Sequence, residues 1–247
     1  MEFGEPREPV VLQRNGSVGI MVWQNEEQNR FTTPFLQAIE QGLAELAADD
    51  DVRGVVLTSA LPRCWCTGLH LAWLLEESAC DPDAPATFLE LLHRVLLQLT
   101  GFPKPVVAAL NGHAMGGGAI VAAACDYRLM RKDRGFVSLP AVKLSIPFSP
   151  GVIALLQATL PAASFRELAY TGDRFTSARA RELGFIDELH SEDELLPKAV
   201  ALASRLGEAR PSTFAQIKLG LRRTVLETMR RDDPPALERT LAAITGS

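Results

Sequence analysis

The sequence predicts an α/β protein, because apolar strand-like runs alternate with helical patterns along the chain. Residues 55–57 (VVL) and 106–110 (VVAAL) are two such runs, and each leads through a glycine-containing turn into a helical pattern. A chain of 247 residues is long enough to bury one substantial core and a modest appendage. We therefore expect a core region at residues 1–190 and a helical region at residues 191–247.

The first half of the chain carries clear signals for a hairpin and a helix. Asn15 and Gly16 separate two apolar stretches and favour the tight turn of a β-hairpin. Thr33 and Pro34 predict a helix that runs to about residue 47, with Thr33 as its cap. The pattern then predicts a buried strand at residues 52–59. A loop with two prolines is expected at residues 79–85, and a helix at residues 87–99.

The second half is predicted to be largely helical at its C-terminal end. Ser177 is the expected cap of a helix that ends at Gly184. Beyond residue 193 the pattern stays helical, and we expect interruptions at Pro211 and again at Pro234 and Pro235. Such breaks leave this region without a core of its own, so we expect it to assemble with further copies of the chain.

Composition and charge exclude two classes of protein. The formal net charge is −5 and the basic residues are scattered, which disfavours nucleic acid as a partner. No apolar run reaches the length of about 18 residues that a membrane span needs. Residues 1–6 are acidic and polar, unlike a signal or transit peptide, so we expect a cytoplasmic protein.

The cysteines do not predict a metal site. Cys64 and Cys66 are separated by one residue, and no second pair or histidine cluster completes a set of zinc ligands. In a reducing compartment all four cysteines, including Cys80 and Cys125, are expected to be small buried apolar side chains. Cys66 stands next to a glycine turn, and we expect it to line a pocket there.

Two glycine-containing turns are the most informative features of the chain. They are CTGLHL at residues 66–71 and NGHAMGGG at residues 111–118. The helices after them would begin near His70 and Gly117, where backbone N–H groups lack a partner and the helix dipole favours negative charge. Two such donors that converge would form an oxyanion hole, with glycine letting the substrate approach the backbone. The alternative is that the turns are two unrelated helix starts.

Together the turns resemble the signature segments of the crotonase (enoyl-CoA hydratase/isomerase) superfamily. Its members carry a G-[AFM]-D-[LI] turn and later an N-G-x-A-x-G-G-G turn; here residues 68–71 read GLHL and residues 111–118 read NGHAMGGG. The likeness continues to the late helix that contains Lys218 and so covers nearly the whole chain. Residues 68–73 and 126–135 look most like the plant-type Δ3,Δ2-enoyl-CoA isomerases.

This resemblance implies a fold, an assembly and a ligand. The fold is a spiral of ββα units, followed by helices that build a homotrimer or hexamer. The ligand is an acyl-CoA thioester, so coenzyme A is part of the substrate, and neither a cofactor nor a metal is expected. The thioester oxygen would lie between the N–H groups of Leu69 and Gly117. Further substrate contacts are expected from Gly68, Leu71, Gly116 and Phe148.

Two basic residues are candidates for binding the phosphates of coenzyme A. By resemblance, Arg63 lies just before the first turn and Lys218 lies on the late helix, where relatives place such residues. A cation near a phosphate gains charge-assisted hydrogen bonds. Each could equally be an ordinary surface charge.

The two carboxylates that family hydratases use are absent from this sequence. The matching positions are Ile120, after the triple glycine, and Ala141, after Pro140. No Asp or Glu occurs between residues 136 and 163. Shifting the alignment to the family motif by a few residues therefore does not place a carboxylate at the second position. The family's isomerases need only the second carboxylate, and this one is missing too.

Three explanations of this absence stay open. Another residue transfers the proton, with His70 as the first candidate because imidazole titrates near neutral pH. Further candidates are His113, which is more readily explained as structural, and Glu76 and Glu77. Alternatively the reaction is a decarboxylation, although family decarboxylases carry Tyr where this chain has Phe148, or the protein binds acyl-CoA without turnover. The intact turns favour an enzyme that isomerises or hydrates an enoyl-CoA.

Overall fold

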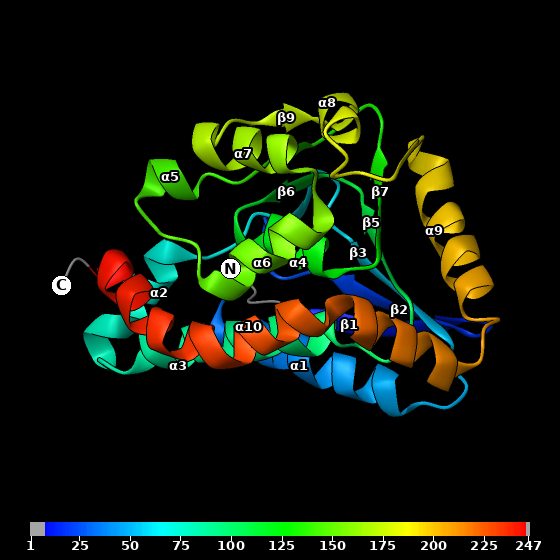
Figure 1. Ribbon diagram of the computed structural model, residues 1–247, viewed down its shortest axis with the longest axis horizontal. Coiled ribbons are helices and arrows are strands. Elements are labelled where there is room, and N and C mark those ends of the chain that lie inside the picture. Colours follow the sequence, from blue (N-terminus) through cyan, green and yellow to red (C-terminus); the bar gives the residue numbers. More distant parts are fainter. Residues whose placement is uncertain (1–7, 246–247) are drawn as a thin grey trace, which may run out of the picture.

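The computed structural model describes residues 8–245 and confirms the α/β class (Figure 1). The polar start predicted at residues 1–6 lies outside the described part. The larger sheet contains, in spatial order, β1 (Val10–Asn15), β2 (Val18–Trp23), β3 (Gly54–Ser59), β5 (Val106–Leu110), β7 (Tyr127–Arg131) and β10 (Glu188–His190). The smaller sheet contains β4 (Cys64–Cys66), β6 (His113–Met115), β8 (Phe136–Ser138) and β9 (Phe175–Thr176). The helices are α1 (Thr33–Ala48), α2 (Leu71–Cys80), α3 (Ala84–Thr100), α4 (Gly117–Ala124), α5 (Ala141–Leu144), α6 (Pro150–Thr159), α7 (Ala162–Thr171), α8 (Ser177–Glu182), α9 (Glu192–Leu206) and α10 (Pro211–Thr245).

Three consecutive strand–strand–helix units supply most strands of the two sheets. The units are β3-β4-α2, β5-β6-α4 and β7-β8-α5. Their first strands pair in parallel in the larger sheet, and their second strands pair in parallel in the smaller sheet. The chain therefore coils as a spiral of ββα units, and the turns that follow the second strands come to lie beside one another.

The larger sheet is buried on both faces. Side chains of one strand alternate between faces, so Val55 and Leu57 of β3 enter the main core while Val56 points the other way. On that second face α9 lies along the sheet (Figure 1), and its Leu202 and Ala203 pack in one cluster with Val56. The region after residue 190 is helical, as predicted, and α9 completes the core of the sheet; a domain boundary at residue 190 stays a prediction.

The predicted hairpin is confirmed, whereas two predicted helix caps are wrong by one residue. β1 and β2 pair antiparallel, and Gly16 between them has a φ of +59°. The cap of α1 is Thr32 rather than Thr33, and the cap of α8 is Thr176 rather than Ser177. In each case the predicted cap and the residue before it are both Ser or Thr, so residue type alone does not choose between them. Thr32 and Thr176 form the caps because their backbone is extended.

The predicted break at Pro234 and Pro235 is also wrong. Pro211 begins α10, but the helix continues through the later pair to residue 245. One face of α10 packs against α3 and α6, and this burial outweighs the cost of about 3 kcal/mol that a proline brings to a helix interior. The buried residues of that face are Val225, Leu226, Met229, Asp233 and Ala236. Among the helices of residues 8–245, none combines the length and apolarity of a membrane span.

Candidate active site

The two glycine turns meet because β4 and β6 are paired neighbours. A Cβ on Gly68 would lie 2.6 Å from the backbone nitrogen of Gly117, and a Cβ on Gly118 would collide with the carbonyl of Cys66. Gly68 also has a φ of +89°, a conformation that side chains disfavour. The glycines therefore allow the two turns to contact each other, a role that adds to the predicted approach of substrate.

Each turn holds one backbone donor in place without pairing it. On either side of Leu69 the backbone is bonded to Phe31. The N–H of Phe31 donates to the carbonyl of Gly68 at 2.7 Å, and the N–H of His70 donates to the carbonyl of Phe31 at 3.1 Å. In the second turn, the N–H of Gly116 donates to the carbonyl of Ser138 at 2.9 Å. The N–H groups of Leu69 and Gly117 themselves have no hydrogen-bond partner within residues 8–245.

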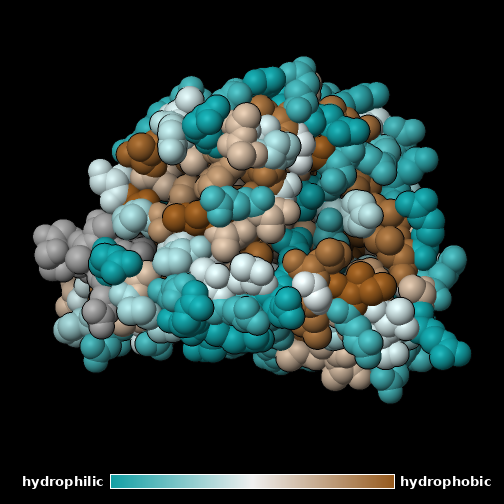
Figure 2. Space-filling model, viewed as in Figure 1, coloured by the Kyte–Doolittle hydropathy of each residue, from teal (hydrophilic) through white to brown (hydrophobic). Residues whose placement is uncertain are grey.

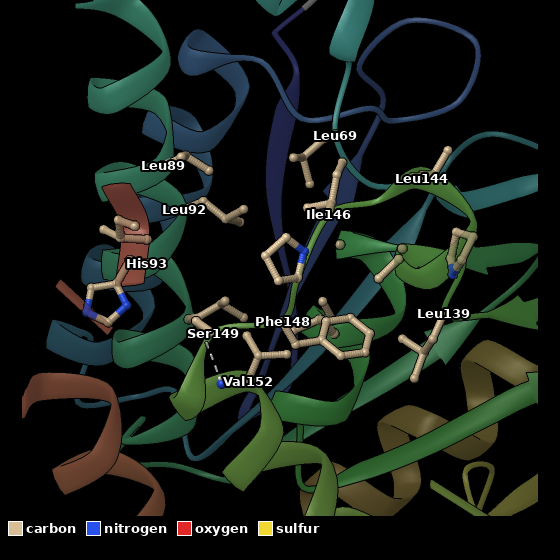
Figure 3. A pocket seen from close by; sticks show the side chains of 18 of the residues that line it. Leu69, Leu89, Leu92, His93, Leu139, Leu144, Ile146, Phe148, Ser149 and Val152 are labelled. Carbon is tan, nitrogen blue, oxygen red and sulfur yellow. Dashed lines mark hydrogen bonds between the residues drawn. The ribbon is translucent and has the colours of Figure 1, made fainter. Parts of the chain in front are cut away.

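Both turns open into an apolar cavity of about 170 Å³. Figure 3 shows Leu89 and Leu92 of α3 on one side of it and Leu139 and Leu144 on the other. Among the described residues that line the cavity, those with polar side chains are Thr67, His93, Ser149 and Asp233. Such a cavity suits an aliphatic chain, because burial of apolar surface is its main source of affinity.

The family model for enoyl-CoA hydratase/isomerase matches residues 13–241 of the chain. The chain belongs to this family. It is 29% identical over 209 residues to the mitochondrial enoyl-CoA hydratase domain-containing protein 2 of Mus musculus, covering 83% of this chain and 68% of that protein. It is 28% identical over 212 residues to the carnitinyl-CoA dehydratase of Salmonella typhi, covering 85% and 79%.

Solved structures of this family have the same fold. The human mitochondrial Δ3-Δ2-enoyl-CoA isomerase has a TM-score of 0.90 at 22% identity, covering 96% of this chain and 92% of that one. The enoyl-CoA hydratase of Bacillus halodurans has a TM-score of 0.84 at 21% identity, covering 96% and 94%. These likenesses confirm the spiral of ββα units, and the family match over residues 13–241 confirms the crotonase resemblance. The closer likeness to plant-type isomerases stays a prediction.

The two positions that match the family carboxylates in sequence lie in the wall of the cavity. Ile120 of α4 and Ala141 at the start of α5 both line it, next to Pro140. The two matched positions therefore line the cavity with apolar side chains. Any proton transfer in this cavity has to use a different group.

The histidines predicted near the turns serve the backbone. His70 caps α2, and its Nδ1 accepts the N–H of Trp73 at 3.1 Å. The Nδ1 of His113 accepts the N–H of Phe136 at 3.2 Å, and burial lowers its pKa. These bonds occupy one ring nitrogen of each histidine and give both a structural role. Glu76 and Glu77 are exposed on α2.

The structure supports some of the predicted substrate contacts and not others. Besides Leu69 and Gly117, the cavity wall includes Leu71, Gly116 and Phe148. Gly68 packs against the backbone of Gly117 and is not part of the wall. Cys66 is fully buried and donates its thiol to the carbonyl of Asn29 at 3.0 Å, so it belongs to the core rather than to the cavity surface. Burial raises the pKa of the Cys66 thiol well above its usual range, which removes it as a nucleophile.

Of the two basic residues predicted to bind phosphate, only Arg63 is exposed. Lys218 is buried, and its Nζ lies 2.8 Å from Oδ2 of Asp126 and 3.3 Å from the carbonyl of Lys104. Desolvation lowers the pKa of Lys218 despite its carboxylate partner. The ammonium group therefore stabilises the fold at this place, and the predicted phosphate contact is not supported.

Sequence reasoning missed the two titratable residues that do line the cavity, His93 and Asp233. His93 lies on α3 between Leu89, Leu92 and Leu96, which all line the cavity. A histidine in the middle of an apolar helix face was the available signal. Asp233 comes directly before Pro234 and Pro235, which predict a helix break that the structure does not contain.

Proposed function

We propose that the protein isomerises or hydrates the double bond of an enoyl-CoA thioester. The observation that carries the proposal is the pair of unpartnered N–H groups, of Leu69 and Gly117, on two contacting turns at an apolar cavity. A thioester oxygen bound between them would gain negative charge when a neighbouring carbon loses a proton. Donors held in place before the reaction stabilise that charge without reorganisation.

The rest of the substrate suits the surroundings of the turns. The acyl chain would occupy the aliphatic cavity, and the exposed Arg63, just before the first turn, is a candidate for a phosphate of coenzyme A. Coenzyme A is part of the substrate, and the proposal requires no further cofactor. A cytoplasmic location belongs to the proposal as well, because the four cysteines are free, as is typical of a reducing compartment.

The proposal includes assembly into a homotrimer or hexamer through the C-terminal helices. A second surface pocket is lined by three large apolar side chains that are exposed to solvent, those of Tyr127, Ile217 and Leu221. Figure 2 shows apolar surface next to the N-terminal half of α10. Contiguous apolar surface of this kind supports contact with another protein chain.

The test is to incubate the purified protein with 3-enoyl-CoA and 2-enoyl-CoA substrates of several chain lengths. Chromatography would separate 3-enoyl, 2-enoyl and 3-hydroxyacyl products. We expect interconversion of the enoyl isomers or addition of water. Binding of acyl-CoA, measured by calorimetry, without any product would contradict the proposed reaction while leaving a binding role.

A further inference from the structure

His93 and Asp233 are the titratable residues among the described residues of the cavity wall. Both are withdrawn from solvent, since the side chain of His93 is 12% exposed and that of Asp233 is 3% exposed. They lie 140 positions apart in the chain and are brought together where α10 packs on α3. Figure 3 places His93 on the same helix as Leu89 and Leu92, across the cavity from Leu139.

The carboxylate of Asp233 is held from both sides. Its Oδ1 accepts the N–H of Gly151 at 2.6 Å, in the first turn of α6, where the helix dipole favours a negative charge. Its Oδ2 lies 3.4 Å from Nδ1 of His93. A Cβ on Gly151 would collide with this carboxylate, so glycine at that position makes room for it. Asp233 is therefore a fixed acceptor beside the imidazole.

This arrangement orients the histidine for proton exchange. A carboxylate beside Nδ1 favours the tautomer that carries its proton on Nδ1. The other nitrogen, Nε2, is then free to accept a proton. Ile120 and Ala141 carry no titratable group, and apart from His93 and Asp233 no described side chain of the cavity wall titrates.

We propose that His93 is the catalytic acid and base of this enzyme, with Asp233 as its positioning residue, for the isomerisation of a 3-enoyl-CoA; this rests on the proposed function. Nε2 takes a proton from C2 of the thioester, and the electron pair moves to the thioester oxygen at Leu69 and Gly117. The dienolate then takes a proton from the same Nε2 at C4, or returns one to C2, and exchange of the Nε2 proton with solvent before this transfer brings deuterium from D2O into the substrate. The double bond thus moves from C3–C4 to C2–C3, without any oxidant, reductant or added water.

The experiment follows a 3-enoyl-CoA in D2O by NMR and chromatography, for the wild type and for His93→Gln, His93→Ala and Asp233→Asn. We expect kcat for isomerisation and the rate of deuterium incorporation at C2 to fall about 10²–10⁴-fold in His93→Gln, with acyl-CoA affinity nearly unchanged. Imidazole added to His93→Ala should restore part of the exchange, which a structural role would not produce. Asp233→Asn should lower kcat without raising KM, because Asn still accepts from Gly151. His190→Gln is the matched control, since that histidine pairs with Glu188 on the larger sheet.

The outcomes separate the two proposals. Wild-type exchange at C2 that depends on His93, without isomerisation or hydration, would overturn the proposed function and keep His93 as the proton carrier. Isomerisation and exchange at wild-type rates in a folded His93→Gln would overturn the role of His93 and keep the proposed function. Absence of both exchange and turnover in the wild type would overturn both.

Discussion

Substitution of Gly68 by alanine is the most direct test of the contact between the two turns. The new Cβ would lie 2.6 Å from the nitrogen of Gly117 and 3.0 Å from the carbonyl oxygen of Met115. Both neighbours are backbone atoms, so the turns have to separate. Because this movement displaces the N–H of Gly117, we expect the loss of one oxyanion-hole donor, which typically lowers kcat about 10²–10³-fold, or about 2.7–4 kcal/mol.

Gly16→Ala is the matched control for this variant. Gly16 also has a positive φ, +59°, but a Cβ there has no atom within 4 Å. Each variant should lose about 1–2 kcal/mol of stability from left-handed backbone strain, which corresponds to about 2–8 °C in Tm for a domain of this size.

The assay measures kcat for 3-enoyl-CoA isomerisation together with Tm by calorimetry. Only Gly68→Ala should lose activity, although both variants become less stable. A Gly68→Ala protein with wild-type kcat and a lowered Tm would refute the reasoning, because the clash would then not reach the N–H of Gly117.

Three further predictions follow from buried groups and exposed surface. Lys218→Met should cost about 3–5 kcal/mol in urea denaturation, because it leaves Asp126 without its cation, while acyl-CoA affinity stays unchanged; a selective loss of that affinity would restore the phosphate role. Thiol alkylation followed by mass spectrometry should modify Cys80 in the native protein, because this cysteine is exposed and the prediction that it is buried is wrong. Cys66 and Cys125 should react only after unfolding, since burial raises both pKa values, that of Cys125 to about 12; rapid native labelling of either would contradict their burial. Light scattering at micromolar concentration should report a trimer or hexamer, and a monomer would contradict assembly.

The sequence by itself determined the features that depend on neighbouring residues. The hairpin at Gly16 and the helix starts after the two glycine turns are set by local backbone preferences, and the structure confirms them. The sequence also shows directly that residues 136–163 contain no Asp or Glu, and the match of Ile120 and Ala141 to the family carboxylates stays a prediction. Family membership followed from the spacing of the motifs.

Only the tertiary structure decided which groups meet at the cavity. His70, adjacent to a glycine turn, caps a helix, whereas His93, remote from both turns in sequence, reaches the cavity wall. Its partner Asp233 depends on α10 continuing past two prolines, which packing against α3 and α6 makes possible. Lys218 was likewise drawn into a buried ion pair by the contact of α10 with the core. Local sequence patterns report the conformation of the backbone, but side-chain partners from distant segments are selected by burial, and burial exists only once the chain has folded.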